Sequence, residues 1–431
     1  MNTKKLIKEF NKPDTHLVIS RWPKAGASYD GVATYTQDIV TRFAKKYGDK
    51  FVILAEKIDN HVIEQVNENV LVIRTFDERR FHLYPQVLTW LKAFSQVKKV
   101  YIHSEFCASG GPIVRFLVVP FVGLIRLFGK EITFYAHNVV KNLDGFEGHL
   151  GEGSGKLKLL SLGYRWYFRL LSVLVSRFVV LESSIKQRLQ EMVGERPILV
   201  EPHWIAPAKT KLTREQARKK LGISLSKRVV VSFGFVTHYK GADFMADFAT
   251  RLSKQEKTKR TMMVLAGGEA YSLKDKAYYQ RYYQKIKTAA NTCAQLTLTD
   301  FLSETEVSLW LTAADVVVLP YRNLMGGSGA LQQALRYGKP VLFSRAVAKG
   351  LGIDQDQLTF AHTYSSLNTL LNRFFEDKTF ANQVQDFGKT YAGQLSVKTM
   401  LPKHYQEVYA GNSEKEMVEH HEALVFQPVQ V

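Results

Sequence analysis

The sequence predicts an α/β protein made of two doubly wound domains, each with a mostly parallel sheet. Short apolar runs rich in Val, Ile and Leu alternate with longer segments whose apolar residues recur at helical spacing. The runs are unbroken rather than alternating, which is typical of strands buried on both faces of a parallel sheet. At 431 residues the chain is too long for one ordinary core and has room for two domains of about 200 residues.

The first domain is expected over residues 1–205. Its elements begin in the order β-α-β-β-α-β, which favours a doubly wound sheet. The expected strands are 16–20, 51–54, 70–73, 99–103, 132–135, 179–181 and 198–200, and the expected helices are 32–46, 83–95 and 156–178.

The second domain is expected over residues 206–395, after a charged segment that contains Pro207 and resembles a linker. A helix at 396–410 and a loose polar tail at 411–431 follow it. The expected strands are 228–233, 262–266, 296–298, 316–319 and 341–343, and the expected helices are 278–290, 304–315, 330–337, 365–376 and 396–409.

The net charge of +19 calls for an anionic partner or another explanation, but it does not favour nucleic acid. Residues 1–205 carry 29 basic and 20 acidic residues (+9), and the remainder carries 30 and 20 (+10). Nucleic-acid binding proteins concentrate such charge in a patch or a recognisable module. The spread charge fits anionic small molecules or an anionic membrane surface.

Compartment follows from the cysteines and from the hydropathy pattern. Only Cys107 and Cys293 occur, far apart and without a CxxC motif, which indicates a reducing compartment. The N-terminus lacks the apolar core of a signal peptide, and we expect no membrane-spanning segment. We therefore expect a cytoplasmic protein, with attachment to the inner face of the plasma membrane left open.

Two segments are the reason why membrane attachment is left open. Residues 113–129 are very apolar but are interrupted by Arg115, Pro120 and Arg126, so they read either as a buried helix in two pieces or as a partially inserted segment. Residues 156–178 combine five basic residues with apolar ones and contain no acid. They predict a basic amphipathic helix whose polar face is either solvated or turned to a membrane surface or anionic acceptor.

Glycine-rich loops between strands and helices mark the candidate sites. In 314–344 an apolar strand leads to Gly326-Gly327-Ser328-Gly329 and then to a helix. Backbone N–H groups and the helix dipole at such a point can bind phosphate, although a structural tight turn explains the loop equally well. Gly26 and Gly31 frame a similar loop after the first strand, and His137 with Asn138 ends another strand, where α/β sheets place ligands.

Taken in order, these motifs resemble the GT-B-fold glycosyltransferases, most closely family four, the retaining nucleotide-sugar transferases. The matching segments are GASYDGVATY, FYAHNVV, VVLESSIKQRL, GFVTHYKG, LTDFLSETEVSLWLTAADVVVLPY and GSGALQQALRYGKPV, within residues 16–409. The resemblance implies two Rossmann-like domains that face a cleft, with the helix at 396–410 packing back on the first. It also implies a hexosyltransferase that moves a sugar from a nucleotide-diphospho-sugar to a glycan or lipid-linked acceptor, in cell-envelope or exopolysaccharide synthesis.

The resemblance also assigns residues. Lys240 matches the lysine that binds the donor phosphates, and His137 matches the histidine that faces the transferred sugar and acceptor. The remaining donor-side positions are Gly26, Gly31, Gly234, Leu302, Glu306, Arg322, Ser328, Gly329 and Ala330. No metal or other cofactor is expected, since the family generally needs none and Asp354-Gln355-Asp356 does not follow an apolar strand as a metal-binding DxD should.

Three positions depart from the family pattern. Phe235 stands where a phosphate-binding Arg is usual, and Met325 and Gln333 stand where two glutamates hold the donor sugar and a ribose. These losses leave an alternative, namely a catalytically impaired GT-B homologue that acts as a binding partner or scaffold.

Overall fold

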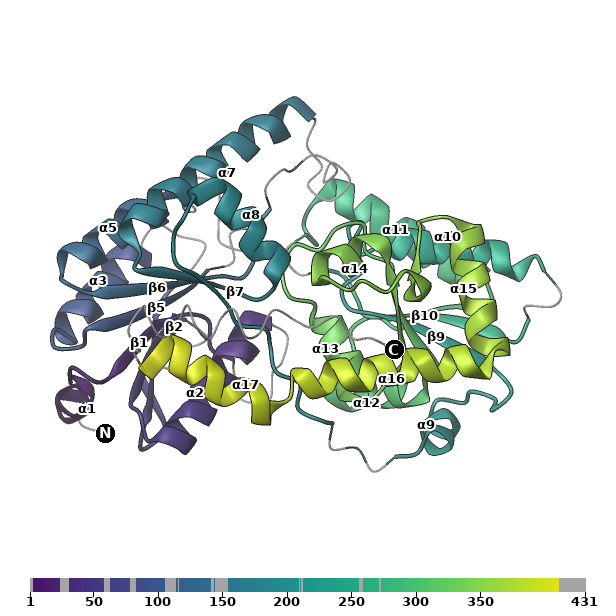
Figure 1. Ribbon diagram of the computed structural model, residues 1–431, viewed down its shortest axis with the longest axis horizontal. Coiled ribbons are helices and arrows are strands. Elements are labelled where there is room, and N and C mark those ends of the chain that lie inside the picture. The colour runs from purple at the N-terminus through teal and green to yellow at the C-terminus, as the bar shows by residue number, and fades with distance from the viewer. Residues whose placement is uncertain are drawn as a thin grey trace. The chain divides into compact units, whose positions relative to one another are not determined.

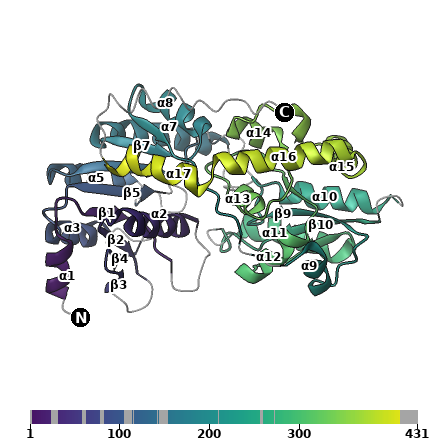
Figure 2. The ribbon, with the colours of Figure 1, turned by 60° about the horizontal axis from the view of Figure 1, so that its bottom comes forward.

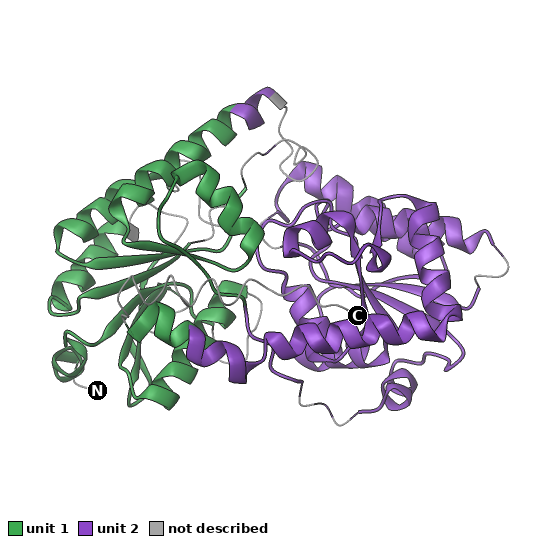
Figure 3. Cartoon of the chain, viewed as in Figure 1, with its two compact units in different colours: residues 1–142, 159–202, 404–411 green, residues 143–158, 203–403, 412–431 purple. Residues whose placement is uncertain are grey.

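The computed structural model forms two compact units, shown in different colours in Figure 3. Unit 1 contains the described parts of residues 1–142, 159–202 and 404–411, and unit 2 contains those of residues 143–158 and 203–403. The structure describes residues 3–23, 31–57, 63–77, 83–104, 114, 116–140, 143, 154–208, 210, 212–255, 259–270 and 273–410.

Unit 1 is built on an eight-stranded sheet in the order β3-β4-β2-β1-β5-β6-β7-β8 (Figure 1). All neighbouring strands are parallel except β3, which runs antiparallel to β4. The strands are β1 (His16–Ile19), β2 (Phe51–Glu56), β3 (Ile63–Asn67), β4 (Val70–Phe76), β5 (Lys99–Ser104), β6 (Glu131–Ala136), β7 (Arg177–Val180) and β8 (Ile198–Val200). The doubly wound sheet predicted for this half of the chain is confirmed.

Helices cover both faces of this sheet with apolar stripes. In α2, Val32, Thr36, Ile39 and Phe43 recur at helical spacing and are buried. Helix α1 (Thr3–Phe10) precedes the first strand, and the described helices between strands are α2 (Gly31–Tyr47), α3 (Leu83–Ala93), α5 (Val118–Leu127), α7 (Ser154–Leu174) and α8 (Ser183–Val193).

The last described turn of the chain, Tyr405–Ala410, is π-helical and packs in unit 1. Tyr409 stacks on Tyr101 with ring centroids 4.4 Å apart, and Tyr405 stacks on Tyr47 at 3.5 Å. Lys99 Nζ donates a 2.8 Å hydrogen bond to the carbonyl of Tyr409. Aromatic stacking therefore fixes this end of the chain to the N-terminal unit.

Unit 2 has a six-stranded, fully parallel sheet in the order β11-β10-β9-β12-β13-β14. The strands are β9 (Arg228–Phe233), β10 (Thr261–Ala266), β11 (Leu296–Leu298), β12 (Val316–Leu319), β13 (Val341–Ser344) and β14 (Thr359–Phe360). The helices are α9 (Arg214–Lys220), α10 (Ala242–Ser253), α11 (Ala277–Thr292), α12 (Glu304–Ala313), α13 (Gly329–Arg336), α14 (Arg345–Leu351), α15 (Tyr364–Glu376), α16 (Lys378–Gln394) and α17 (Val397–His404), with the chain path visible in Figure 2.

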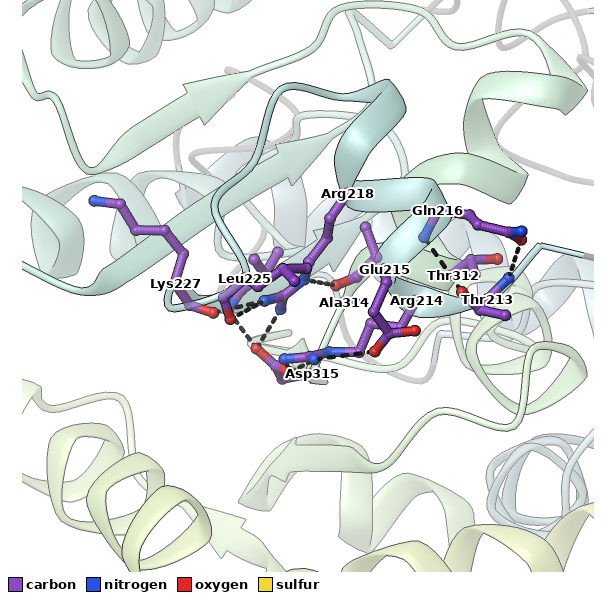
Figure 4. Close-up of polar contacts among 12 residues, drawn as sticks. Thr213, Arg214, Glu215, Gln216, Arg218, Leu225, Lys227, Thr312, Ala314 and Asp315 are labelled. Atoms are coloured by element: carbon purple, nitrogen blue, oxygen red, sulfur yellow. Dashed lines mark hydrogen bonds and ion pairs between the residues drawn. The ribbon is translucent and has the colours of Figure 1, made fainter.

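A buried ion pair fastens α9 to the start of β12 (Figure 4). Arg218 is 0% exposed, and it donates to Asp315 Oδ2 at 2.7 Å and to the carbonyls of Ala313 and Lys227. Asp315 also accepts from Arg214 and from the backbone N–H of Val229 in the central strand β9. The carboxylate of Asp315 thus joins the helix α9 to the central strand β9.

The described part of the apolar segment 113–129 is mostly helical but is buried on one face only. Residues 114 and 116 are helical, residue 117 is a turn, and α5 begins at Val118, so the predicted interruption lies before Pro120. Proline is tolerated in a first helical turn because the N–H it lacks has no partner there. Phe121, Val122 and Ile125 are buried, whereas the opposite face is exposed.

Some elements have no counterpart among the sequence expectations. The short strands β3 and β14 are weakly apolar, and α1 lies in a polar leader. No helix in the described part of the chain is long and apolar enough to cross a membrane.

Candidate functional site

The candidate donor site lies at the carboxyl edge of the unit 2 sheet. There the loop after β9 joins the loop after β10, since Val236 N–H donates to Gly268 O at 2.9 Å. The buried hydroxyl of Tyr279 donates to Val236 O at 2.8 Å and fixes the β9 loop from α11. Open α/β sheets bind ligands at this edge.

Lys240 is the central side chain of this edge. Its Nζ lies 5.7 Å from the ring centroid of Phe235, 5.9 Å from that of Tyr239 and 5.7 Å from that of Tyr321. Burial lowers the pKa of Lys240 to about 8. Among the described residues no carboxylate neutralises this ammonium group, so aromatic faces hold a cation whose charge an anionic ligand could balance.

Two glycines permit this placement of Lys240. Gly234 has φ of 116°, and a Cβ built on it would lie 2.8 Å from Lys240 Nζ, so a side chain there would occupy the space of the ammonium group. Gly241 has φ of 75°, and its Cβ would lie 2.1 Å from the carbonyl oxygen of Pro320. Only glycine therefore fits where the β9 loop meets the end of β12.

We expect Gly241→Ala to lower the free energy of unfolding by more than the cost of a left-handed alanine alone, which is about 1 kcal/mol. The Cβ clash with Pro320 must displace the loop that carries Lys240, so nucleotide binding should weaken as well. Gly222→Ala is the matched control, because Gly222 has φ of 68° and open space around its Cβ position. Denaturant titration and nucleotide titration of both variants check this prediction; equal effects would contradict it.

Arg322, a predicted donor-binding residue, makes ion pairs within the unit. Its guanidinium donates to both carboxylate oxygens of Asp243 at 2.8 and 2.7 Å, and its backbone N–H donates to Tyr239 O. Tyr282 OH donates to the same carboxylate at 3.0 Å. The Arg322 pairing lowers the pKa of Asp243 against the opposing effect of burial. Arg322 thus ties the end of β12 to the start of α10, directly after Lys240.

Ser328, Gly329 and Ala330 form the start of α13. Ser328 is the N-cap, and its Oγ accepts from Leu331 N–H at 3.2 Å. Gly329 is exposed and has nothing near its Cβ position, whereas the side chain of Ala330 is buried. Ser328 Oγ also lies 3.4 Å from the hydroxyl of Tyr321, whose ring contacts Lys240. One tyrosine therefore links the lysine to the positive end of a helix dipole.

Glu306 and Leu302 lie at the start of α12. Glu306 forms a capping box with Ser303, accepting from its N–H at 2.8 Å and from its Oγ at 2.6 Å. These hydrogen bonds lower the pKa of Glu306. Leu302 is half-buried next to the exposed ring of Phe301. The predicted base or ribose contact at Glu306 would therefore compete with a helix cap.

Of the three departures from the family pattern, only Phe235 has a local explanation. Phe235 places a ring face beside Lys240 and packs edge-on against Phe301 with centroids 5.7 Å apart. A ring in place of a guanidinium removes one positive charge that would otherwise repel the ammonium group of Lys240. Gln333 lies within α13 and is half-buried. Nothing in the structure explains Met325.

Unit 1 contains a second cluster, centred on His137 at the end of β6. His137 is buried, its Nε2 lies 3.2 Å from His103 Nδ1, and Tyr35 packs edge-on against it at 5.4 Å. His103 is stacked on Tyr135, and burial lowers its pKa to about 3, so its ring is neutral at physiological pH. Gly31 begins α2 and is exposed with open space around it. Gly26 lies outside the described residues.

The described residues contain no group of three or more His, Cys, Asp or Glu side chains placed to hold a metal ion. Asp356 begins a short 3-10 turn, Asp356–Leu358, in a loop.

Comparisons with known proteins show which family and which solved structures this chain resembles. Residues 213–389, most of unit 2, match the family described as "Glycosyl transferases group 1". Most of unit 2 is therefore a domain of this glycosyltransferase family, and the chain has the GT-B fold. No curated protein matches its sequence.

Solved structures of glycosyltransferases share the fold over nearly the whole chain. Sucrose-phosphate synthase from Thermosynechococcus elongatus superposes with a TM-score of 0.71 at 14% identity, covering 93% of this chain and 100% of its own. HepE from Anabaena, solved with UDP and glucose, has a TM-score of 0.66 at 14% identity, with 95% and 100% covered. WaaG, a glycosyltransferase involved in lipopolysaccharide biosynthesis, has a TM-score of 0.64 at 14% identity, with 92% and 100% covered.

Some residues of this glycosyltransferase were missed by sequence reasoning. Tyr321 and Asp243 organise the Lys240 region, yet an aromatic after a strand and an acid in a first helical turn are too common to be singled out. His103 had a usable signal, because it is the penultimate residue of the strand β5 and His137 directly follows β6.

Proposed function

We propose that this glycosyltransferase moves a hexosyl group from a nucleotide-diphospho-sugar to a glycan or lipid-linked acceptor, with retention of the anomeric configuration. The observation that carries the proposal is Lys240, a desolvated ammonium group held by three aromatic rings without an acidic partner among the described residues. A cation in that environment favours the binding of a phosphate group.

The chemistry follows from where charge develops. The bond between the anomeric carbon and the β-phosphate oxygen breaks, and the nucleoside diphosphate leaves with the bonding electron pair. The acceptor oxygen bonds to the anomeric carbon, and its proton passes to an oxygen of the leaving phosphate. Lys240 would stabilise the charge gathered on the pyrophosphate, assisted by the N–H groups of Gly329 and Ala330 at the start of α13. We propose that this positive charge serves in place of a metal ion.

In unit 1, we propose that His137 contacts the transferred sugar and the acceptor. Its neighbour His103 is held neutral by burial, so the close nitrogen atoms of the two rings share one proton as a hydrogen bond. This contact restricts the tautomer and ring orientation of His137. A fixed imidazole can donate to or accept from a sugar hydroxyl without rearrangement.

The biological setting is proposed from the likeness to the solved structures of WaaG and HepE. WaaG is involved in lipopolysaccharide biosynthesis, and HepE was solved with UDP and with UDP-glucose. These neighbours support a cytoplasmic enzyme of cell-envelope or exopolysaccharide synthesis and make UDP-sugars the first donors to test.

The test is a donor screen with the full chain. UDP-, GDP- and ADP-sugars are offered with simple glycoside or lipid-linked acceptors, nucleoside diphosphate release is measured, and the product's anomeric configuration is read by NMR. We expect one donor class to give turnover with retention. Inverted product would refute retention, and the absence of both nucleotide-sugar binding and turnover across the screen would favour the scaffold alternative.

A further inference from the structure

The helix α7 carries an apolar stripe that the core of unit 1 does not use. Leu159, Leu162, Trp166, Leu170 and Val173 follow one another at intervals of three or four residues, so they share one face of the helix. All five are exposed, Leu159 at 70% and Trp166 at 53%. On the opposite face Tyr164, Phe168 and Leu171 are already buried. We refer to the exposed five residues as the α7 stripe.

The neighbouring helix α5 extends this apolar surface. Leu124, Leu127 and Phe128 are exposed at its C-terminal end, Leu127 at 83%. The two helices touch, since a Cβ built on Gly123 would lie 3.9 Å from Leu174 and one on Gly163 would lie 3.2 Å from Phe116 (Figure 1). Both contacts lie in unit 1, so α5 and α7 run side by side. A surface with so many large apolar side chains marks an interaction site.

The charges at this surface indicate what it binds. Lys158, Arg165 and Arg169 recur at helical spacing along one flank of the α7 stripe, and Arg126 lies on α5. Neither helix contains an Asp or Glu. Arg169 lies 5.4 Å from the ring of Trp166, which places a cation beside the aromatic anchor. Large apolar residues flanked by cations, on two helices without an acidic residue, match the interface of a bilayer that contains anionic lipid.

We propose that the α5–α7 surface binds the face of an anionic phospholipid bilayer, with the α7 stripe lying in the headgroup region. The same helix positions the candidate acceptor-side residues, because Tyr164 OH donates a 2.8 Å hydrogen bond to the carbonyl of Asn138, next to His137. The inference deepens the proposed function, on which its biological meaning rests: an acceptor with a lipid anchor is presented at such a surface.

The test is sedimentation of the full chain with vesicles of phosphatidylcholine, alone and with added phosphatidylglycerol, in the absence of any substrate. We expect binding to the anionic vesicles that weakens as salt is raised. Leu162→Gln and Trp166→Gln should each lower the partition constant for the vesicles about tenfold, because each removes one large apolar side chain that the bilayer would bury. Lys158→Glu should lower it about tenfold through charge reversal.

Matched controls separate the surface from general effects. Leu225→Gln replaces a leucine that is 57% exposed in unit 2, and Lys285→Glu reverses an exposed charge there; both should bind like the wild type. The proposal would be overturned if the wild-type protein stayed in the supernatant with both kinds of vesicle, or if the stripe variants sedimented like the controls. It would also be overturned if the wild type bound no vesicles but self-associated, and Trp166→Gln abolished that self-association. Activity on a soluble acceptor should survive in the stripe variants, so failure of the glycosyl transfer is recognised independently of vesicle binding.

Discussion

Lys240→Met is expected to lower kcat by about 10²- to 10³-fold, the usual effect of removing one preorganised group that stabilises transition-state charge. Methionine keeps most of the aliphatic volume among Phe235, Tyr239 and Tyr321, so the loss reports the ammonium group rather than packing. Steady-state kinetics with the donor found in the screen measure the effect. Lys285→Met is the control, since Lys285 is exposed in the middle of α11 and should leave kcat unchanged.

Lys240 should also make the affinity for nucleotide depend on pH. Burial lowers the pKa of Lys240 to about 8, and a bound pyrophosphate would raise it by favouring the charged form. Affinity should therefore be full below pH 8 and should fall as pH rises above about 8, by up to tenfold per pH unit. In Lys240→Met this decline should disappear. A wild type whose affinity is constant between pH 7 and about 9.5 would contradict the assignment.

Asp315→Asn is expected to lower the free energy of unfolding of unit 2 by about 3 kcal/mol or more. The change leaves the guanidinium of Arg218, which is 0% exposed, without its counter-charge, and breaking a buried pair on one side typically costs 3 to about 5 kcal/mol. It also weakens the contact to the backbone of Val229 in the central strand β9. Chemical denaturation followed by a probe in unit 2 gives the measurement.

The matched control makes the same chemical change on the surface. Asp386 pairs with Lys389 at 3.0 Å, but both side chains are well exposed, so Asp386→Asn should change stability by less than about 1 kcal/mol. The double variant Asp315→Asn with Arg218→Met should recover much of the loss, since no uncompensated charge then remains. Equal stability of Asp315→Asn and Asp386→Asn would contradict the structural role given to the pair.

The fold was predictable from the sequence because most of its strands are short unbroken runs of apolar residues. Val316–Leu319 is an unbroken apolar run, and in the structure all four residues are buried in the middle of a parallel sheet. The antiparallel edge strand Ile63–Asn67 is half polar, so its identity depends on pairing with Val70–Phe76 rather than on its own composition.

The candidate site was predictable in part. A glycine-bounded loop before a helix is visible in the sequence, so Lys240 and Ser328 could be named from their neighbours. The surroundings of these two residues were not predictable, because they depend on contacts between distant parts of the chain: Tyr321 lies near both Lys240 and Ser328, and Arg322 pairs with Asp243. Arg322 shows the limit most clearly: its charge suggests a phosphate ligand, whereas the structure pairs it with Asp243.

The most direct test of the phosphate site at Lys240 is the affinity for a nucleoside diphosphate relative to the monophosphate of the same nucleoside, measured by calorimetric titration of the wild type and Lys240→Met. A charge-assisted hydrogen bond to the second phosphate predicts a wild-type preference for the diphosphate of about 10- to 100-fold, most of which the variant should lose. A variant that keeps the full preference would show that the second phosphate binds elsewhere and would contradict the assignment.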